Sequence, residues 1–191
     1  NIAANGKLQR PGVCNAIECL LVHEKAAKEF LPKLVAKFDG KAAFRCDEAS
    51  YQIVMEANKQ AANKAEVSKA IPEDFDTEFL DYILAIKTVS STEEAVDFIN
   101  AHNTKHSETI ITKNTDNAKT FQAKVDASCV YVNASTRFTD GEMFGFGAEL
   151  GISTQKMHIR GPMGLKALTT TKYLIYSYVQ FRFLFQNPNI V

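Results

Sequence analysis

The sequence lacks a surplus of either charge, because its 191 residues carry 22 Lys and Arg against 22 Asp and Glu. Proteins whose main partner is nucleic acid need a basic surplus to bind phosphates, so we expect no nucleic-acid partner. No run approaches the roughly 18 apolar residues of a membrane span. The first residues are small and polar, without the basic start and apolar core of a signal peptide. We therefore expect no membrane association.

Cysteine is also scarce, with four residues and no CxxC pair. This pattern does not favour a disulfide framework or a structural zinc site, and it fits a reducing compartment such as the cytoplasm. We expect no metal. The four histidines form no HExxH motif and lie near no Ser–Asp pattern, so a zinc hydrolase or a Ser–His–Asp triad has no support.

The composition, with 46% apolar and 23% charged residues, is typical of a soluble globular protein. The apolar run at 17–22 is short enough for a buried strand or the end of a helix. Apolar spacing and helix propensity predict the other elements: strands at 42–44, 83–89, 109–112 and 129–133, and helices at 24–38, 51–70, 92–101 and 115–124. This alternation predicts an α/β domain with a mainly parallel sheet flanked by helices.

The character of the chain changes at residue 134, where a glycine-rich polar loop begins and runs to residue 151. Residues 173–179 then form a strongly β-prone segment, and an aromatic tail follows at 181–185. Such a strand needs a partner, which a second chain could supply. We therefore divide the chain into a thiol-bearing domain at 1–134 and a segment at 135–191 that holds a loop, a return segment and this late strand.

Cys14 is the first candidate for chemistry, because it follows the Pro11–Gly12 turn and precedes an apolar segment. A thiol at a turn that enters a helix has a lowered pKa, since backbone N–H groups and the helix dipole favour the thiolate. The alternative is a small hydrophobic residue of the core, which is our interpretation of Cys129. Cys19 and Cys46 have no comparable setting, and we interpret both as structural.

Two loops carry further candidates. Glu78 lies in an acidic segment just before a predicted strand, where it either binds a ligand or belongs to a solvated acidic face. Ser135, Thr136 and Arg137 follow the strand at 129–133. Hydroxyls and a guanidinium at such a position form either an anion site or an ordinary turn.

The glycines at 145, 147 and 151 superficially suggest a nucleotide-binding loop. They do not match GxGxxG after a first strand, so we reject a Rossmann fingerprint. Close backbone packing explains them better.

Several longer motifs occur in a fixed order along the chain. They are QRPGVCNA at 9–16, TEFLDYILA at 77–85, HSE at 106–108, VYVNASTRFTDG at 130–141, FGFGAELGIST at 144–154, RGPMGL at 160–165 and LTT at 168–170. From about residue 7 to about residue 182, the chain resembles the gamma-glutamyl phosphate reductase family of the aldehyde dehydrogenase superfamily. The resemblance implies an aldehyde dehydrogenase-like catalytic domain with a C-terminal oligomerisation strand, and thus a homo-oligomer.

The family reduces L-glutamyl 5-phosphate with NADPH to L-glutamate 5-semialdehyde and releases phosphate, in proline biosynthesis. The resemblance therefore implies that Cys14 is the nucleophile. Its thiolate would attack the acyl phosphate and form a thioester, which then accepts a hydride from the cofactor. The backbone N–H of Cys14 would help to stabilise the oxyanion.

The resemblance also implies cofactor-binding residues. Glu78 corresponds to a glutamate that binds the nicotinamide ribose of NADPH, and Leu80 takes the place of an aromatic residue beside it. Asp81 and Tyr82 replace the Gly–Pro of the wider superfamily, as they do in this subfamily.

The implied substrate-binding residues are those of the loop that anchors the far end of the substrate, together with two residues beside the nucleophile. They are Arg10, Asn15, Ser135, Thr136 and Arg137. We expect Ser135, Thr136 and Arg137 to bind a carboxylate or phosphate of the substrate, with Arg10 as a second candidate for phosphate.

The family's N-terminal NADPH-binding domain would precede Cys14 and is absent from the sequence. We therefore expect a C-terminal part of the enzyme that is inactive or nearly so in isolation. Two alternatives stay open: the parent is a bifunctional glutamate kinase–reductase, or the chain is an inactive assembly module.

Overall fold

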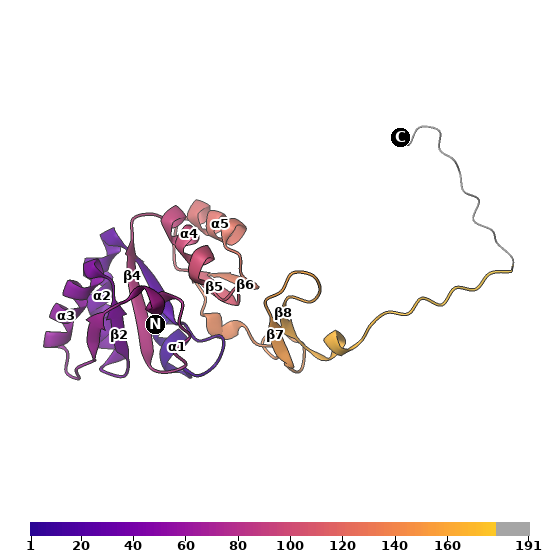
Figure 1. The fold of residues 1–191 in the computed structure, drawn as a ribbon, viewed down its shortest axis with the longest axis horizontal. Coiled ribbons are helices and arrows are strands. Elements are labelled where there is room, and N and C mark those ends of the chain that lie inside the picture. The colour runs from indigo at the N-terminus through magenta and orange to yellow at the C-terminus, as the bar shows by residue number, and fades with distance from the viewer. Residues whose placement is uncertain (179–191) are drawn as a thin grey trace, which may run out of the picture.

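Helices and strands alternate along the computed structural model, which describes residues 1–178 (Figure 1). The α-helices are α1 (Ile2–Leu8), α2 (Glu24–Phe38), α3 (Glu48–Gln60), α4 (Thr92–His102) and α5 (Thr115–Lys124). The strands are β1 (Cys19–His23), β2 (Ala43–Cys46), β3 (Val67–Lys69), β4 (Ile83–Val89), β5 (Ser107–Ile110), β6 (Cys129–Val132), β7 (Gly151–Ser153) and β8 (Gly161–Met163). Three short 3₁₀ helices are η1 (Pro72–Phe75), η2 (Thr136–Phe138) and η3 (Leu165–Leu168).

The main sheet has four strands in the order β1-β4-β2-β3, and every pair in it is parallel. β5 and β6 form a second parallel pair, whereas β7 and β8 form an antiparallel hairpin. The predicted α/β class with a mainly parallel sheet is therefore confirmed, and the open alternative at 17–22 is resolved as a strand.

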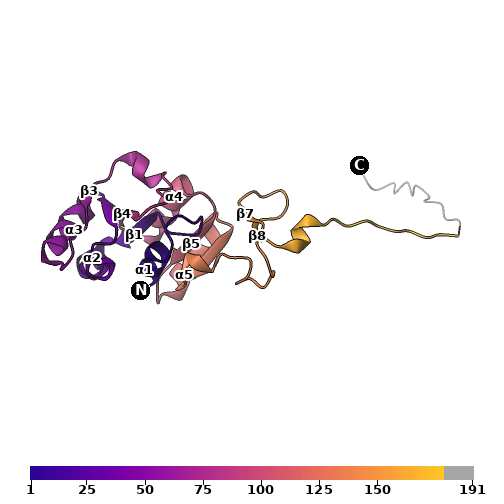
Figure 2. The same ribbon diagram turned by 90° about the horizontal axis from the view of Figure 1, so that it is seen from below.

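Helices α2 and α3 lie side by side against the main sheet, while α4 and α5 lie with the β5–β6 pair (Figures 1 and 2). The apolar face of α2 buries Leu31 and Phe38 completely, and the ring of Phe38 lies 5.4 Å from that of Phe44 on β2. α2 has the predicted bounds, and Asp39, the capping residue after Phe38, adopts a left-handed φ of 51°. This core fixes the strands whose amino ends carry the candidate site.

The helix predicted at 51–70 is wrong in its second half. α3 begins earlier, at Glu48, because the side chain of Asp47 caps it, and it ends at Gln60. Asn58 stops its continuation: its side chain donates to the carbonyl of Ala65 and accepts from the same residue's N–H. Helix propensity is a weak signal where an edge strand of the sheet, here β3, can form instead.

The helix predicted at 115–124 is observed as α5 with the same bounds. The helix predicted at 92–101 is observed as α4, which extends one residue further, to His102. The strand expected at 109–112 lies two residues earlier, as β5. Ser91 and Glu94 have the spacing of a capping box, but only one of its two hydrogen bonds forms. Ser91 caps the N–H of Glu94, but the carboxylate of Glu94 accepts from Ser90.

The structure forms no strand over residues 173–178, the described part of the strand expected at 173–179. This segment instead runs away from the domain as an extended arm (Figure 1), with Tyr173, Ile175 and Tyr176 more than four-fifths exposed. Strands need a paired neighbour, and within residues 1–178 no strand lies beside the arm. Residue 179 and the aromatic tail lie outside the described residues.

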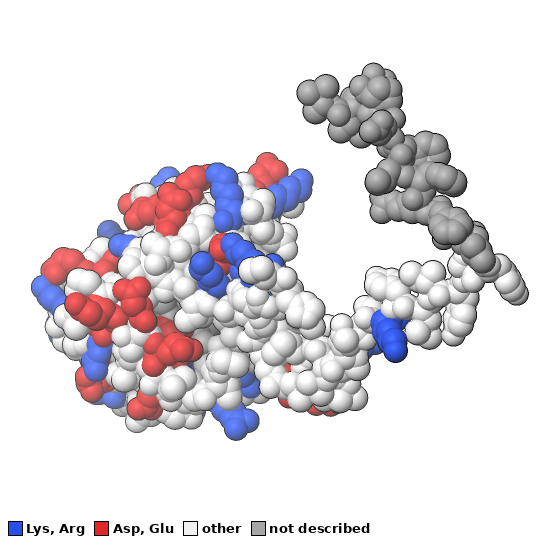
Figure 3. Space-filling view, turned by 45° about the vertical axis from the view of Figure 1, so that its right-hand side comes forward, with Lys and Arg blue, Asp and Glu red and all other residues white. Residues whose placement is uncertain are grey.

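Acidic and basic side chains are interspersed over the globular part on the face drawn in Figure 3, whereas the arm is almost uncharged. This mixing agrees with the balanced charge of the sequence. Among residues 1–178, no helix is both long and apolar enough to cross a membrane.

Candidate active site

The candidate residues gather at the amino ends of the strands of the main sheet. Cys14 lies in the turn that leads into β1, and Glu78 lies in the loop that leads into β4. η2 directly follows the carboxyl end of β6, so residues 135–137 lie where the sequence predicts them. From there η2 packs onto Asn15 of the thiol turn.

Asn15 joins the thiol turn to η2 through both ends of its side chain. Its Nδ2 donates to the carbonyl of Thr139 at 2.9 Å, and its Oδ1 accepts from Nη1 of Arg137. The hydroxyl of Thr136 donates to the backbone carbonyl of Asn15 at 2.7 Å. Asn15 is 7% exposed, so these bonds are shielded from water. The two predicted segments thus form one site.

Arg137 keeps part of its guanidinium available. Its Nε donates to Gln9 and its Nη1 to Asn15, whereas Nη2 has no acceptor among residues 1–178. The hydroxyls beside it are differently placed: Ser135 and Thr136 are buried, and Ser135 accepts from the backbone N–H of Arg137. Both hydroxyls are thus engaged in hydrogen bonds to backbone groups. Nη2 of Arg137 is the donor of this loop that stays available to a ligand.

The thiol of Cys14 is exposed at the turn, but no helix follows it, since β1 comes next. The pKa of Cys14 lies above its ordinary value because partial burial disfavours the thiolate, with the carboxylates of Glu149 and Glu78 adding to the effect. The guanidinium of Arg137 acts in the opposite direction. The predicted lowering of this pKa by a helix N-terminus is therefore wrong, and the resting residue is a thiol.

Glu78 and Leu80 lie beside the thiol turn. A Cβ atom placed on Gly12 would lie 3.5 Å from the carbonyl oxygen of Leu80, so the two loops are in contact. Glu78 is exposed, and its carboxylate makes no hydrogen bond or ion pair with the rest of the described chain. The carboxylate of Glu78 can therefore accept hydrogen bonds from a ligand, and the exposed side chain of Leu80 offers it an apolar surface.

Arg10 lies one turn before Cys14, and its side chain is exposed. Within residues 1–178, Arg10 forms no hydrogen bond or ion pair. Its guanidinium is therefore free to meet an anion, but nothing orients it toward Cys14.

His106 and Glu149 are members of the site that the residue patterns did not single out. The Nδ1 of His106 pairs with the hydroxyl of Ser107 at 2.7 Å, which continues to Thr139 at 2.6 Å. Burial lowers the pKa of His106, and the same two carboxylates that act on Cys14, those of Glu78 and Glu149, oppose this shift. The only sequence signal for either residue is its place in a motif of the family.

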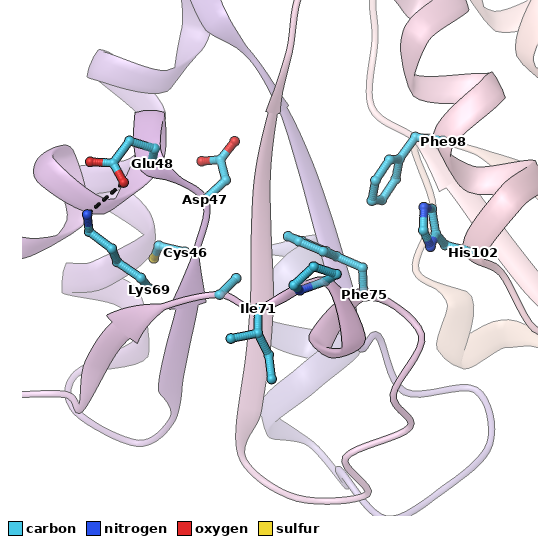
Figure 4. Close-up of a pocket in the computed structure, with 10 residues that line it drawn as sticks. Cys46, Asp47, Glu48, Lys69, Ile71, Phe75, Phe98 and His102 are labelled. Atoms are coloured by element: carbon cyan, nitrogen blue, oxygen red, sulfur yellow. Dashed lines mark ion pairs between the residues drawn. The ribbon is translucent and has the colours of Figure 1, made fainter.

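A separate pocket of about 430 Å³ lies at the opposite edge of the sheet, at the carboxyl ends of β2 and β3 (Figure 4). Phe98 and His102 stand on one side of it, and an ion pair between Glu48 and Lys69 stands on the other. None of the predicted site residues lines it. Within residues 1–178, no cluster of three or more His, Cys, Asp or Glu could hold a metal.

Comparison with known proteins relates this arrangement to one family. Residues 73–173, more than half of the chain, match the model of the aldehyde dehydrogenase family. The gamma-glutamyl phosphate reductase of Clostridium tetani is 55% identical over 184 residues, which are 95% of this chain and 43% of the relative. The enzyme of the same name from Clostridium acetobutylicum is 56% identical over 182 residues.

A solved structure agrees with these matches. The crystal structure of gamma-glutamyl phosphate reductase from Thermotoga maritima superposes with a TM-score of 0.85 at 49% identity, covering 95% of this chain and 42% of that one. The chain thus spans less than half the length of the relatives it matches. The fold is aldehyde dehydrogenase-like, as the sequence predicted, and this chain belongs to the aldehyde dehydrogenase family.

Proposed function

We propose that this chain carries the catalytic thiol of a gamma-glutamyl phosphate reductase, which converts L-glutamyl 5-phosphate into L-glutamate 5-semialdehyde and phosphate. The observation that carries the proposal is the hydrogen bond from Arg137 to the side chain of Asn15, which places a free guanidinium donor beside an exposed thiol. Relatives over 95% of the chain bear this name, and this supports the same assignment.

Cys14 is the nucleophile in this proposal. Its thiolate attacks the acyl carbon, the carbon–oxygen bond to phosphate breaks, and phosphate leaves with the bonding electrons. The product on the protein is a thioester at Cys14. Because the resting thiol has a raised pKa, attack also requires loss of its proton, which the positive charge of Arg137 favours. The backbone N–H of Cys14 is the donor proposed for the developing oxyanion.

The substrate is held by the loop that packs on the thiol turn. Arg137 offers Nη2 to a carboxylate or phosphate, and Asn15 holds that guanidinium in place. Ser135 and Thr136 shape the loop from inside. Arg10, exposed and uncommitted, is the second residue proposed for the phosphate.

The proposed cofactor is NADPH, which when bound supplies the hydride that reduces the thioester. Glu78 would accept hydrogen bonds from the nicotinamide ribose, because its carboxylate has no other partner in the described chain. Leu80 would give the ring an apolar surface, since its side chain is 54% exposed beside the thiol turn.

We propose a homo-oligomer that forms through the arm around residues 173–179. The support is the exposure of Tyr173, Ile175 and Tyr176 in a β-prone segment. Removing residues 171–191 should convert the oligomer to a monomer in light scattering, and an unchanged mass would contradict this. The four cysteines are all free, which supports a reducing location such as the cytoplasm.

The test is a chimera in which this chain replaces the matching part of the Clostridium tetani reductase. The measured rate is the reduction of NADP⁺ in the presence of glutamate 5-semialdehyde and phosphate. Cys14→Ser should lower the rate at least about 10³-fold. Cys129→Ala, which removes a thiol from β6, serves as the matched control and should stay near the parent rate. An inactive parent chimera, or an active Cys14→Ser variant, would contradict the proposal.

A further inference from the structure

An ion pair between Lys7 and Glu18 lies inside the chain next to the candidate site. Nζ of Lys7 is 2.5 Å from Oε2 of Glu18, and the side chain of Lys7 is completely buried. Burial lowers the pKa of Lys7 and raises that of Glu18, because removal from water disfavours the charged form of each group. Replacing a buried ion pair by apolar residues is often neutral for stability. Stability alone therefore does not explain why this pair is buried here.

The carboxylate of Glu18 also holds backbone. Its Oε1 accepts a hydrogen bond from the N–H of Leu80 at 3.4 Å. The N–H of Phe79 also favours the charged carboxylate and thereby lowers its pKa. Leu80 has a φ of 53°, a left-handed conformation that is uncommon for a residue other than glycine. Such a conformation persists where the surroundings hold it. Glu18 is the side chain that supplies this hold.

The segment held in this way is the loop of Glu78. The carbonyl of Leu80 faces Gly12 in the thiol turn, and the backbone carbonyl of Glu18 accepts from Ala85 on β4. Lys7 meanwhile comes from α1, which leads directly into the thiol turn. One buried pair thus connects α1, the start of β1 and the loop before β4.

We propose that Glu18, held by Lys7, is a positioning residue that fixes the Glu78–Leu80 loop against the turn of Cys14. This rests on the proposed function in so far as the loop binds the cofactor. Glu18 does not touch the reacting atoms. It fixes where Glu78 stands, and a displacement of such a group by about 1 Å can cost on the order of 10² in rate.

Two double variants separate this role from a structural one. Lys7→Met with Glu18→Gln removes both charges but keeps an oxygen that can accept from Leu80. Lys7→Met with Glu18→Leu removes the charges and the acceptor. Both avoid the single variants, in which one buried charge loses its partner and folding itself is at risk. Thermal unfolding and circular dichroism identify the conditions in which both chains are folded.

The first readout needs no cofactor and uses the whole 191-residue chain. Hydrogen exchange at the amides of Phe79 and Leu80 should be at least about tenfold faster in the Leu variant than in the Gln variant, since only the latter keeps the acceptor. Amides of α5, far from the pair, are the internal control. Equal exchange at Phe79 and Leu80 in the two variants would overturn the proposal.

The second readout uses the chimera. The KM for NADP⁺ should rise about tenfold in the Leu variant relative to the Gln variant, with a smaller change in the KM for semialdehyde. Equal KM values for NADP⁺ in an active, Cys14-dependent chimera would overturn the positioning role and leave the proposed function intact. Loss of the Cys14 dependence would instead contradict the proposed function, while the exchange experiment would still decide the role of Glu18.

Discussion

Arg137 donates to the side chain of Asn15, a residue 122 positions earlier in the chain. Asn15 directly follows Cys14, so this bond sets the distance between a cationic group and the thiol. The amide of Asn15 serves both sides, because its oxygen accepts from Arg137 and its nitrogen donates to Thr139. A carboxylate or a hydrocarbon at position 15 could not do both.

Replacing Asn15 by Ala should lower the free energy of unfolding by about 1–3 kcal/mol, because the carbonyl of Thr139 and Nη1 of Arg137 lose a buried partner. Urea denaturation measures this change. Asn5→Ala is the control: Asn5 is exposed and makes only a long bond to Gln9, so its loss should cost less than about 0.5 kcal/mol. Equal losses of unfolding free energy at the two positions would show that the hydrogen bonds of Asn15 do not contribute to stability.

Neutralising Glu149 should make Cys14 more reactive, because that carboxylate raises the pKa of the thiol. We expect Glu149→Gln to speed alkylation of Cys14 by iodoacetamide at pH 7 about two- to fivefold, the effect of removing one nearby charge. Mass spectrometry assigns the modified site. Glutamine keeps the acceptor for the N–H of Gly141, so the loop retains its bond.

Glu142→Gln is the matched control for that experiment, since Glu142 is exposed in the same loop and does not act on the pKa of Cys14. It should leave the alkylation rate unchanged. The buried Cys46, whose pKa burial raises to about 12, should react far more slowly than Cys14 in every variant. A Glu149→Gln chain that reacts no faster than the parent would refute the electrostatic role of Glu149.

Elements with a strong local signal could be predicted from the sequence. α2 combines apolar residues at helical spacing with Asp39–Gly40 at its end, and it has the predicted bounds. The segment at 61–70 has strong helix propensity but few apolar residues at helical spacing. Its residues 67–69 form β3 instead, because they pair with β2. That pairing joins residues more than twenty positions apart, which no local pattern contains.

The site was predictable as a set of residues but not as an arrangement. The motifs of the family include Cys14, Glu78 and Arg137, and in the structure both charged residues act on the thiol of Cys14. The raised pKa of Cys14 depends on Glu149, which lies 135 positions further along the chain and forms no pattern with it. Lys7 and Glu18 gave no signal either, since a charged pair spaced by eleven residues is usually solvent-exposed.

Glu108 should make stability fall as the pH rises, because desolvation raises its pKa to about 7. A carboxyl whose folded pKa is raised stabilises the fold below its unfolded pKa of about 4.3, and this contribution is lost as the pH rises through about 7. Glu108→Gln should therefore gain up to about 3 kcal/mol over the parent between pH 5 and pH 8. Urea denaturation at both pH values tests this, with Glu142→Gln as an exposed control. A pH-independent difference would exclude titration of Glu108 as the cause.

Asp126 should hold the β7–β8 hairpin on the domain. Its carboxylate contacts Lys156 at 2.7 Å and Arg160 at 2.8 Å, and these cations lower its pKa to about 2. A lowered carboxyl pKa means that the contribution is present above the unfolded value of about 3.9 and is lost as the pH falls through about 2. Both cations come from the segment that joins β7 to β8.

Asp126→Asn should therefore speed hydrogen exchange in residues 151–163 at pH 7 while exchange in the main sheet stays unchanged. The carboxylate is solvent-accessible, so 1 M salt should produce part of the same effect in the parent chain. Asp97→Asn, an exposed position on α4 without a cationic partner in the described chain, is the matched control. If the hairpin exchanges equally in the Asp126 and Asp97 variants, the hydrogen bond from Ser128 to the carbonyl of Ser153 suffices to hold it.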